Sequence, residues 1–143
     1  MPAIPPPAGD AVLPPEDLFA IHDLMARYGH VIDERQWEQF ADVFTADCRY
    51  DASDFGMPVW HGLQGLMDGM RGSDAHPVAH HTTNVVIGAP ADDGSVQILS
   101  KGPGVGAKGR VGSAVYEDVA VRTDAGWRLA SRIATLRRPE PQP

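Results

Sequence analysis

The chain has 143 residues, of which 43% are hydrophobic and 22% are charged, the composition of an ordinary globular protein. This length suits one domain and is too short for two. The formal net charge of -7 argues against binding to nucleic acid or to an anionic membrane surface through broad electrostatic attraction. No apolar run approaches the roughly 20 residues of a transmembrane helix, and the start of the chain does not resemble a signal peptide, so we expect a cytoplasmic protein.

Both ends of the chain are rich in proline and have little that could pack against a core. We therefore predict flexible tails at residues 1–14 and 139–143, and a folded domain over residues 15–138. Cys48 is the only cysteine, which excludes an intrachain disulfide, and we expect it to be a small buried hydrophobe.

Hydrophobic periodicity predicts helices in the first half of the chain. Apolar residues recur at helical spacing over residues 18–32, and a break is expected near Asp33. Gly29 weakens this helix by about 1 kcal/mol relative to alanine. A shorter helix is expected over residues 63–70. Between the two, another helix would bury four apolar residues: Trp37, Phe40, Val43 and Phe44.

The rest of the chain has the pattern of extended strands. After an early strand at residues 48–52, four more are predicted, over residues 79–87, 95–101, 110–122 and 127–137. Short turns between them indicate antiparallel hairpins. Helices that come first and then pack on one face of such a sheet define an α+β domain. The glycines of residues 101–110 are interpreted as a hairpin loop, because a dinucleotide-binding loop would have to open a helix.

Alternation along the last two strands predicts which side chains share a face. One set is mostly apolar and is expected to meet the helices: Val111, Ser113, Val115, Glu117, Val119, Val121, Trp127, Leu129, Ser131, Ile133, Thr135 and Arg137. The opposite set is expected to be exposed or at a subunit interface: Tyr116, Asp118, Arg128 and Arg132.

His80 and His81 are neighbours on a predicted strand, so only one of them can point into a cavity. Periodicity leaves the choice open, because apolar residues of the same strand share alternation with each of them. Histidine suits proton transfer because it titrates near neutral pH. Asp33 could orient the imidazole ring, and Tyr28 could donate a hydrogen bond to a substrate oxygen.

These residues also have purely structural interpretations. A histidine on a strand is often a satisfied structural residue, Asp33 could cap or end a helix, and Tyr28 could belong to the core. Six histidines raise the alternative of a metal site. The chain has no H-E-x-x-H helix and no cysteine pair, so we expect no metal.

The chain resembles the SnoaL-like branch of the nuclear transport factor 2 superfamily over about residues 18–138. Three runs carry the resemblance, in this order: YGHVIDERQWEQFADVFTADCRYD, AHHTTNVVI and YEDVAVRTDAGWRLASR. The resemblance implies a cone-shaped fold in which a curved antiparallel sheet wraps around the N-terminal helices and leaves one deep pocket. It also implies a homodimer formed through the outer face of the sheet.

Within that superfamily the chain looks most like scytalone dehydratase, the bile-acid dehydratases and hexachlorocyclohexane dehydrochlorinase, which use a His and Asp pair for elimination. Alignment on Thr83 and Asn84 favours His80 as that histidine, with Asp33 as its partner. Tyr28 stands at the catalytic tyrosine of the bile-acid dehydratases. The first-strand tyrosine of scytalone dehydratase falls near Ala52, and its second pocket histidine has no counterpart around residues 96–101. Four further residues are candidate substrate contacts: His81, Ser113, Arg137 and Trp37.

The sequence therefore predicts a cofactor-independent lyase or isomerase that acts on a hydrophobic, oxygenated small molecule such as a polyketide or a steroid-like ring. His80 would remove the proton, Asp33 would orient it, and Tyr28 would bind oxygen. Polyketide cyclisation or epoxide opening is an alternative reaction on the same fold. A non-catalytic small-molecule-binding or assembly subunit is the alternative from another class. Convergence of the three residues at an apolar cavity would favour the enzyme.

Overall fold

A computed structural model describes residues 2–7, 9 and 11–139. The flexible tails predicted at residues 1–14 and 139–143 lie in part outside the described residues, at 1, 8, 10 and 140–143. The described residues before Pro15 form no helix or strand. In the part of the chain that the structure covers, no helix is long and apolar enough to cross a membrane.

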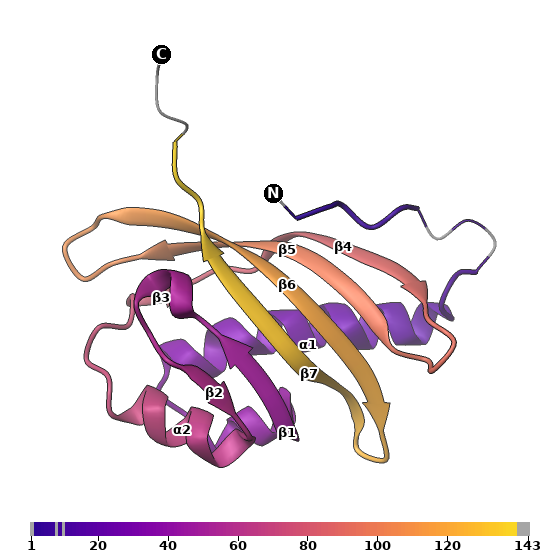
Figure 1. Ribbon diagram of the computed structural model, residues 1–143, viewed down its shortest axis with the longest axis horizontal. Helices are drawn as coiled ribbons and strands as arrows, with labels where there is room; N and C mark the ends of the chain where they lie inside the picture. Colours follow the sequence, from indigo (N-terminus) through magenta and orange to yellow (C-terminus); the bar gives the residue numbers. More distant parts are fainter. Residues whose placement is uncertain (1, 8, 10, 140–143) are drawn as a thin grey trace.

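A long helix, α1 (Pro15–Asp33), lies along one side of a curled sheet (Figure 1). Pro15 and the acidic Glu16 and Asp17 occupy its first turn, where the unpaired N–H groups and the helix dipole favour these residue types. The helix ends at Asp33, where a break was predicted. Its buried face packs in the core through six main side chains: Ile21, Leu24, Met25, Tyr28, Val31 and Ile32.

Gly29 lets α1 approach the sheet closely. An added Cβ at Gly29 would lie only 2.7 Å from the carbonyl oxygen of His80, in strand β3 (Ala79–His80). The helix-propensity cost of glycine, about 1 kcal/mol relative to alanine, is therefore offset by a backbone contact that no other residue allows. Asp33 lies one turn further along α1 and is brought beside His80 by this contact.

One sheet contains all seven strands, in the order β2-β1-β7-β6-β5-β3, with β4 also paired to β5. The other strands are β1 (Phe44–Asp51), β2 (Val59–His61), β4 (Thr83–Pro90), β5 (Val96–Val105), β6 (Val111–Thr123) and β7 (Gly126–Leu136). The hairpins β4–β5, β5–β6 and β6–β7 are antiparallel, as predicted. β1 runs parallel to β7, a pairing that needs a long connection and so could not be inferred from short turns.

The helices between these strands are short. The predicted second helix is the 3-10 helix η1 (Trp37–Asp42), because β1 already begins at Phe44. The helix predicted over residues 63–70 is α2 (Leu63–Arg71), and a further 3-10 turn, η2 (Ser53–Phe55), follows β1. Cys48 is buried in the core, as predicted, and burial raises the pKa of its thiol to about 11.

The predicted faces of β6 and β7 are wrong in part. Tyr116, Asp118 and Arg132 are 4%, 3% and 0% exposed, whereas Val111 is 70% exposed. The inward set on β6 is small or polar, and its members are Ala114, Tyr116, Asp118 and Ala120. Ala114 and Tyr116 line a cavity. The apolar set of β6 lies on the outer face, where Arg128 also lies, paired with Val121.

A bulge inverts the alternation along β7. Leu129 pairs with Ala120, but Ser131 pairs with Val119, so that Ala130 is left without a partner. Before the bulge Trp127 and Leu129 face inward, as predicted. After it the inward residues are Arg132 and Ala134, and the predicted inward set, Ser131, Ile133, Thr135 and Arg137, lies on the outer face.

Candidate active site

A cavity of about 830 Å³ lies between the end of α1, the inner face of the sheet and the segment after α2. This volume is within the range of small-molecule sites, about 300–1,000 Å³. Its polar wall contains Tyr28, Tyr50, Tyr116 and His80. Much of the remaining wall is apolar and includes Ile32, Ala52, Met57, Trp60, Met70, Ala114, Ala134 and Leu136. Such a site suits a mainly hydrophobic molecule that carries an oxygen function.

Asp33 holds His80 at two places. Its two carboxylate oxygens accept the backbone N–H of His80 at 3.0 and 2.9 Å, and Oδ1 also lies 2.6 Å from Nδ1 of the imidazole ring. Because a carboxylate can only accept, Nδ1 carries the hydrogen. The lone pair of the neutral ring is therefore on Nε2, and His80 lines the cavity with its side chain 11% exposed.

The protonation state of His80 suits a base. Burial lowers the pKa of His80 below the usual 6.5, and the hydrogen bond and charge of Asp33 only partly oppose this effect. The imidazole is thus neutral near pH 7, with Nε2 able to accept a proton. Asp33 can then stabilise the imidazolium that forms.

His81 lies outside the cavity. It is exposed, does not line the cavity and follows directly after β3, where its backbone N–H donates to the carbonyl of Pro103. The strand predicted over residues 79–87 is interrupted here, and Asn84 takes a left-handed φ of 52° within a register shift. Regular alternation would place Val85 and His80 on opposite faces, because their positions differ by an odd number of residues. The irregularity inverts the alternation, so that Val85 packs against the core while His80 lines the cavity. The structure therefore does not bring His81, a predicted substrate contact, to the cavity.

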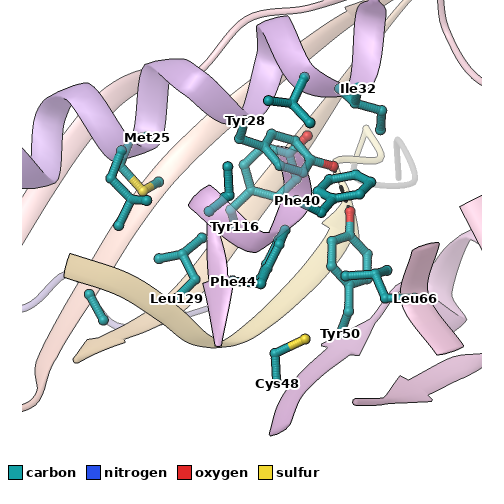
Figure 2. Close-up of a cluster of buried hydrophobic side chains, with 14 of the residues drawn as sticks. Met25, Tyr28, Ile32, Phe40, Phe44, Cys48, Tyr50, Leu66, Tyr116 and Leu129 are labelled. Atoms are coloured by element: carbon teal, nitrogen blue, oxygen red, sulfur yellow. Dashed lines mark hydrogen bonds between the residues drawn. The ribbon is translucent and has the colours of Figure 1, made fainter. Parts of the chain in front are cut away.

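Tyr28 belongs to a cluster of buried tyrosines at the inner end of the cavity. Its hydroxyl lies 2.7 Å from the hydroxyl of Tyr50, and Figure 2 shows the two side chains meeting from α1 and β1. The ring of Tyr116 stands edge-on to that of Tyr28 at 5.9 Å. The ring of His80 lies 6.2 Å from that of Tyr28. Tyr50 lies in β1, two residues before Ala52, and both residues line the cavity.

The tyrosine hydroxyls stay protonated. Burial raises the pKa of Tyr28, Tyr50 and Tyr116 well above the usual 10. In a pair of hydroxyls one hydrogen is used between the two oxygens, which leaves the second available to another acceptor. The cluster can therefore donate a hydrogen bond to an oxygen atom in the cavity.

A buried ion pair lies behind the tyrosines. Arg132 binds Asp118 through two hydrogen bonds of 2.7 and 2.9 Å, and both side chains are 0% exposed. Burial by itself would lower the pKa of Arg132, but the adjacent Asp118 raises it above its usual range, so the guanidinium stays charged. Its central carbon lies 4.0 Å from the ring of Tyr28 and 4.1 Å from the ring of Tyr116. This cation would favour negative charge that develops near the two phenols.

The sequence analysis missed Tyr50, Tyr116, Asp118 and Arg132 as residues of this region. It assigned the polar alternation of β6 and β7 to the outer face because the other alternation is rich in valine. The available signal was the pair of opposite charges, since Asp118 faces Arg132 directly across the hairpin. The bulge at Ala130 conceals that pairing from a simple count along the sequence.

The other predicted substrate contacts do not converge on the cavity. Trp37 is buried, stacks on Phe40 at 5.8 Å and lies behind the cavity wall. Ser113 borders the cavity, but alternation with Ala114 puts its side chain on the outer face with Val115. Arg137 is exposed and lines a separate depression of the outer face. Ser113 and Arg137 were proposed from the resemblance to the family, and both side chains belong to the outer face.

Among the described residues, no group of three or more His, Cys, Asp or Glu side chains is arranged to hold a metal ion. The dyad of Asp33 and His80 instead has the arrangement of a proton-transfer pair, with one partner fixing the tautomer of the other.

The sequence profile of the SnoaL-like domain matches residues 15–133. The chain belongs to the SnoaL-like family. This SnoaL-like protein is similar in structure to a Novosphingobium aromaticivorans protein for which an aromatic ring hydroxylase activity has been proposed. The two share 29% sequence identity and a TM-score of 0.71, over 90% of this chain and 94% of the other.

Two further structures share the fold of the SnoaL-like protein. One is a Novosphingobium aromaticivorans protein proposed to be a scytalone dehydratase, with 19% identity and a TM-score of 0.68 over 86% of this chain and 85% of the other. The other is LinA, with 21% identity and a TM-score of 0.71 over 86% of this chain and 87% of the other. No functionally curated protein matches the sequence. The resemblance inferred from the three sequence runs, and the α+β fold it implied, are thus confirmed.

Proposed function

We propose that this SnoaL-like protein is a cofactor-independent lyase or isomerase in which Nε2 of His80 removes a proton from a carbon of its substrate. The observation that carries the proposal is that Asp33 accepts hydrogen bonds from both the backbone N–H and Nδ1 of His80. Because His80 lines the cavity, its Nε2 is left to accept a proton from a molecule there. A protein that only binds a small molecule has no need of such an oriented pair. Positioned acid and base groups of this kind typically contribute about 10²- to 10⁴-fold in rate.

The cavity indicates the class of substrate, a hydrophobic molecule with an oxygen function. When the C–H bond breaks, its electron pair moves toward that oxygen, and the tyrosine cluster donates a hydrogen bond to the developing charge. If a leaving group is attached at the next carbon, the pair expels it and the reaction is an elimination. If none is present, return of the proton at another carbon gives an isomer. Membership of the family and the fold shared with LinA and the scytalone dehydratase relative support this reading of the site.

A ring-opening probe tests the proposal without knowledge of the natural substrate. In 5-nitrobenzisoxazole a base removes one C–H proton, the N–O bond breaks, and a coloured nitrophenolate is released. We expect the protein to open this ring faster than free imidazole at equal concentration. His80→Gln should lower kcat/KM by about 100-fold, the lower end of the contribution of a positioned base. The matched control is His22→Gln, a change at an exposed histidine of α1. Equal rates for the wild type and His80→Gln would contradict the proposal.

A further inference from the structure

His76 is a second histidine of the cavity, and it lies on the segment between α2 and β3. It is half-buried and lines the same cavity as His80. The two rings are close enough for the charge of His76 to contribute to the lowered pKa of His80. The sequence offered no pattern that would distinguish His76 from the other isolated histidines.

Two contacts fix the ring of His76. Nε2 lies 2.8 Å from the backbone carbonyl of Met70, and since a carbonyl only accepts, Nε2 carries a hydrogen. The ring also packs against that of Trp37 at 5.5 Å. Within the described residues no hydrogen bond is formed by Nδ1 of His76. This nitrogen is therefore the one that can exchange a proton with a molecule in the cavity.

We infer that His76 is the proton donor to the leaving oxygen of the substrate, opposite His80 as the proton acceptor; the inference rests on the proposed function. In the elimination, Nε2 of His80 takes the proton from carbon, and the C–H electron pair forms the double bond. The C–O bond breaks with its own electron pair. The oxygen takes the proton from Nδ1 of His76, so that His76 ends neutral and His80 ends as the imidazolium. Proton exchange with water through the cavity opening restores both.

The ring of His76 lies at the C-terminal end of α2. The carbonyl of Met70 belongs to the last turn of the nine-residue helix α2, where the helix dipole favours cations. The ring of Trp37 lies 5.5 Å from that of His76 and is tilted by 40° to it. His80 is by contrast buried and neutral. The two histidines of the cavity therefore lie in different surroundings, His76 at the end of α2 and His80 buried beside Asp33.

A structural role is the competing explanation, because a histidine that binds a carbonyl of the last helical turn also caps that helix. His76→Gln separates the two roles. A glutamine amide can still donate a hydrogen bond to the carbonyl of Met70, but it cannot transfer a proton. Glutamine can therefore largely take over a purely structural role of His76. It cannot take over the role of a proton donor.

The test compares two probes that differ only in the leaving oxygen. The phenolate released from 5-nitrobenzisoxazole is stabilised by the nitro group and needs no proton donor, whereas that from unsubstituted 1,2-benzisoxazole is more basic and benefits from one. We expect His76→Gln to lower the rate on the unsubstituted compound by about 100-fold more than the rate on the nitro compound. His30→Gln, at an exposed position of α1, is the control and should change neither rate.

The outcomes separate this inference from the proposed function. Equal effects of His76→Gln on the two probes, or no effect on either, would overturn the role of His76 as a proton donor. Failure of the proposed function has a different signature, because His80→Gln would then leave both rates unchanged. Unfolding of His76→Gln in urea, compared with the wild type, shows whether the cap on α2 is retained.

Discussion

Asp33 accepts hydrogen bonds from both the backbone N–H and the ring Nδ1 of His80, so one carboxylate fixes the position and the tautomer of the ring. We expect Asp33→Asn to reduce ring opening of 5-nitrobenzisoxazole by about 100-fold or more, because a neutral amide no longer stabilises the imidazolium. The free energy of unfolding should fall by about 1.5–3 kcal/mol, the usual contribution of hydrogen bonds to a charged group. Asp23→Asn, which removes only an exposed pair with Arg27, is the control for both measurements. A fully active Asp33→Asn protein would show that the ring needs no carboxylate.

The lowered pKa of His80 predicts a pH dependence of stability. Burial sets this pKa below the 6.5 of the unfolded chain, so between the two values the unfolded state binds a proton that the folded state does not. The free energy of unfolding should therefore rise with pH up to about 6.5, and the contribution should be lost as the pH falls through this window. Urea titrations between about pH 5 and 8 should show a steeper rise for the wild type than for His80→Gln. Parallel curves would mean that His80 titrates alike in both states.

The same pKa sets the acid limb of activity. Because only the neutral imidazole can accept a proton, the rate of ring opening should rise with pH and reach its plateau near neutral pH, with a midpoint below 6.5. A midpoint above 6.5 would contradict the dominance of burial over the charge of Asp33.

Gly29 permits the contact between α1 and the carbonyl of His80. We expect Gly29→Ala to lower the free energy of unfolding by about 1–3 kcal/mol, as overpacking does, although alanine is the better helix former. Gly65→Ala in α2 is the matched control, because an added Cβ there meets nothing within 4 Å. It should raise the free energy of unfolding by up to about 1 kcal/mol. If both variants were stabilised, α1 and β3 would not be in the close contact described here.

The buried pair of Arg132 and Asp118 predicts a coupling in stability. Arg132→Met leaves a buried carboxylate without its partner, which should cost about 3–5 kcal/mol. Replacing both residues, with Asp118→Leu as the second change, should cost less than Arg132→Met alone, since no buried charge is left. Urea unfolding of the two single variants and the double variant measures the coupling. Additive costs would show that the two residues do not act as a pair.

The hydroxyls of Tyr28 and Tyr50 form a second coupled pair. Tyr28→Phe leaves the buried hydroxyl of Tyr50 without that hydrogen bond, at a cost of about 1–3 kcal/mol, and the double change to phenylalanine should cost less than the sum of the single changes. On a substrate whose developing charge lies on oxygen, Tyr28→Phe should lower kcat by about 100-fold. A loss seen only in KM would place Tyr28 in binding alone.

Several features of the molecule are decided within short stretches of sequence. Pro15 with Glu16 starts α1, and α1 ends at Asp33, where the break was predicted. Short turns made the antiparallel hairpins from β4 to β7 predictable. The family pattern selected Asp33, His80 and Tyr28. Tyr28 and His80 line the cavity, and Asp33 accepts a hydrogen bond from the ring of His80 without lining the cavity itself. These features depend on neighbours in sequence or on a recurrent motif, so they are readable before the chain is folded.

The faces of the strands were decided only by the tertiary structure. A one-residue irregularity moves every following side chain to the other side of a sheet, and two such irregularities, at Asn84 and at Ala130, inverted the assignment. The irregularity at Asn84 turns Val85 toward the core although it is of opposite parity to His80, and the bulge at Ala130 brings Arg132 inside. Periodicity cannot detect them, because each is one residue in a pattern that looks regular on either side.

The composition of the site likewise follows from packing. Tyr50, His76 and Tyr116 come from three distant segments and meet Tyr28 and His80 only when the sheet curls around α1. The cavity also reverses the usual rule on β6, since the residues of β6 that face it, Ala114 and Tyr116, are small or polar while valines of β6 occupy the outer face. The order of the elements therefore followed from the sequence, and the family resemblance selected the pair of Asp33 and His80, the proposed dyad. The partners of that dyad were decided by the fold, because contacts between distant segments leave no periodic signal.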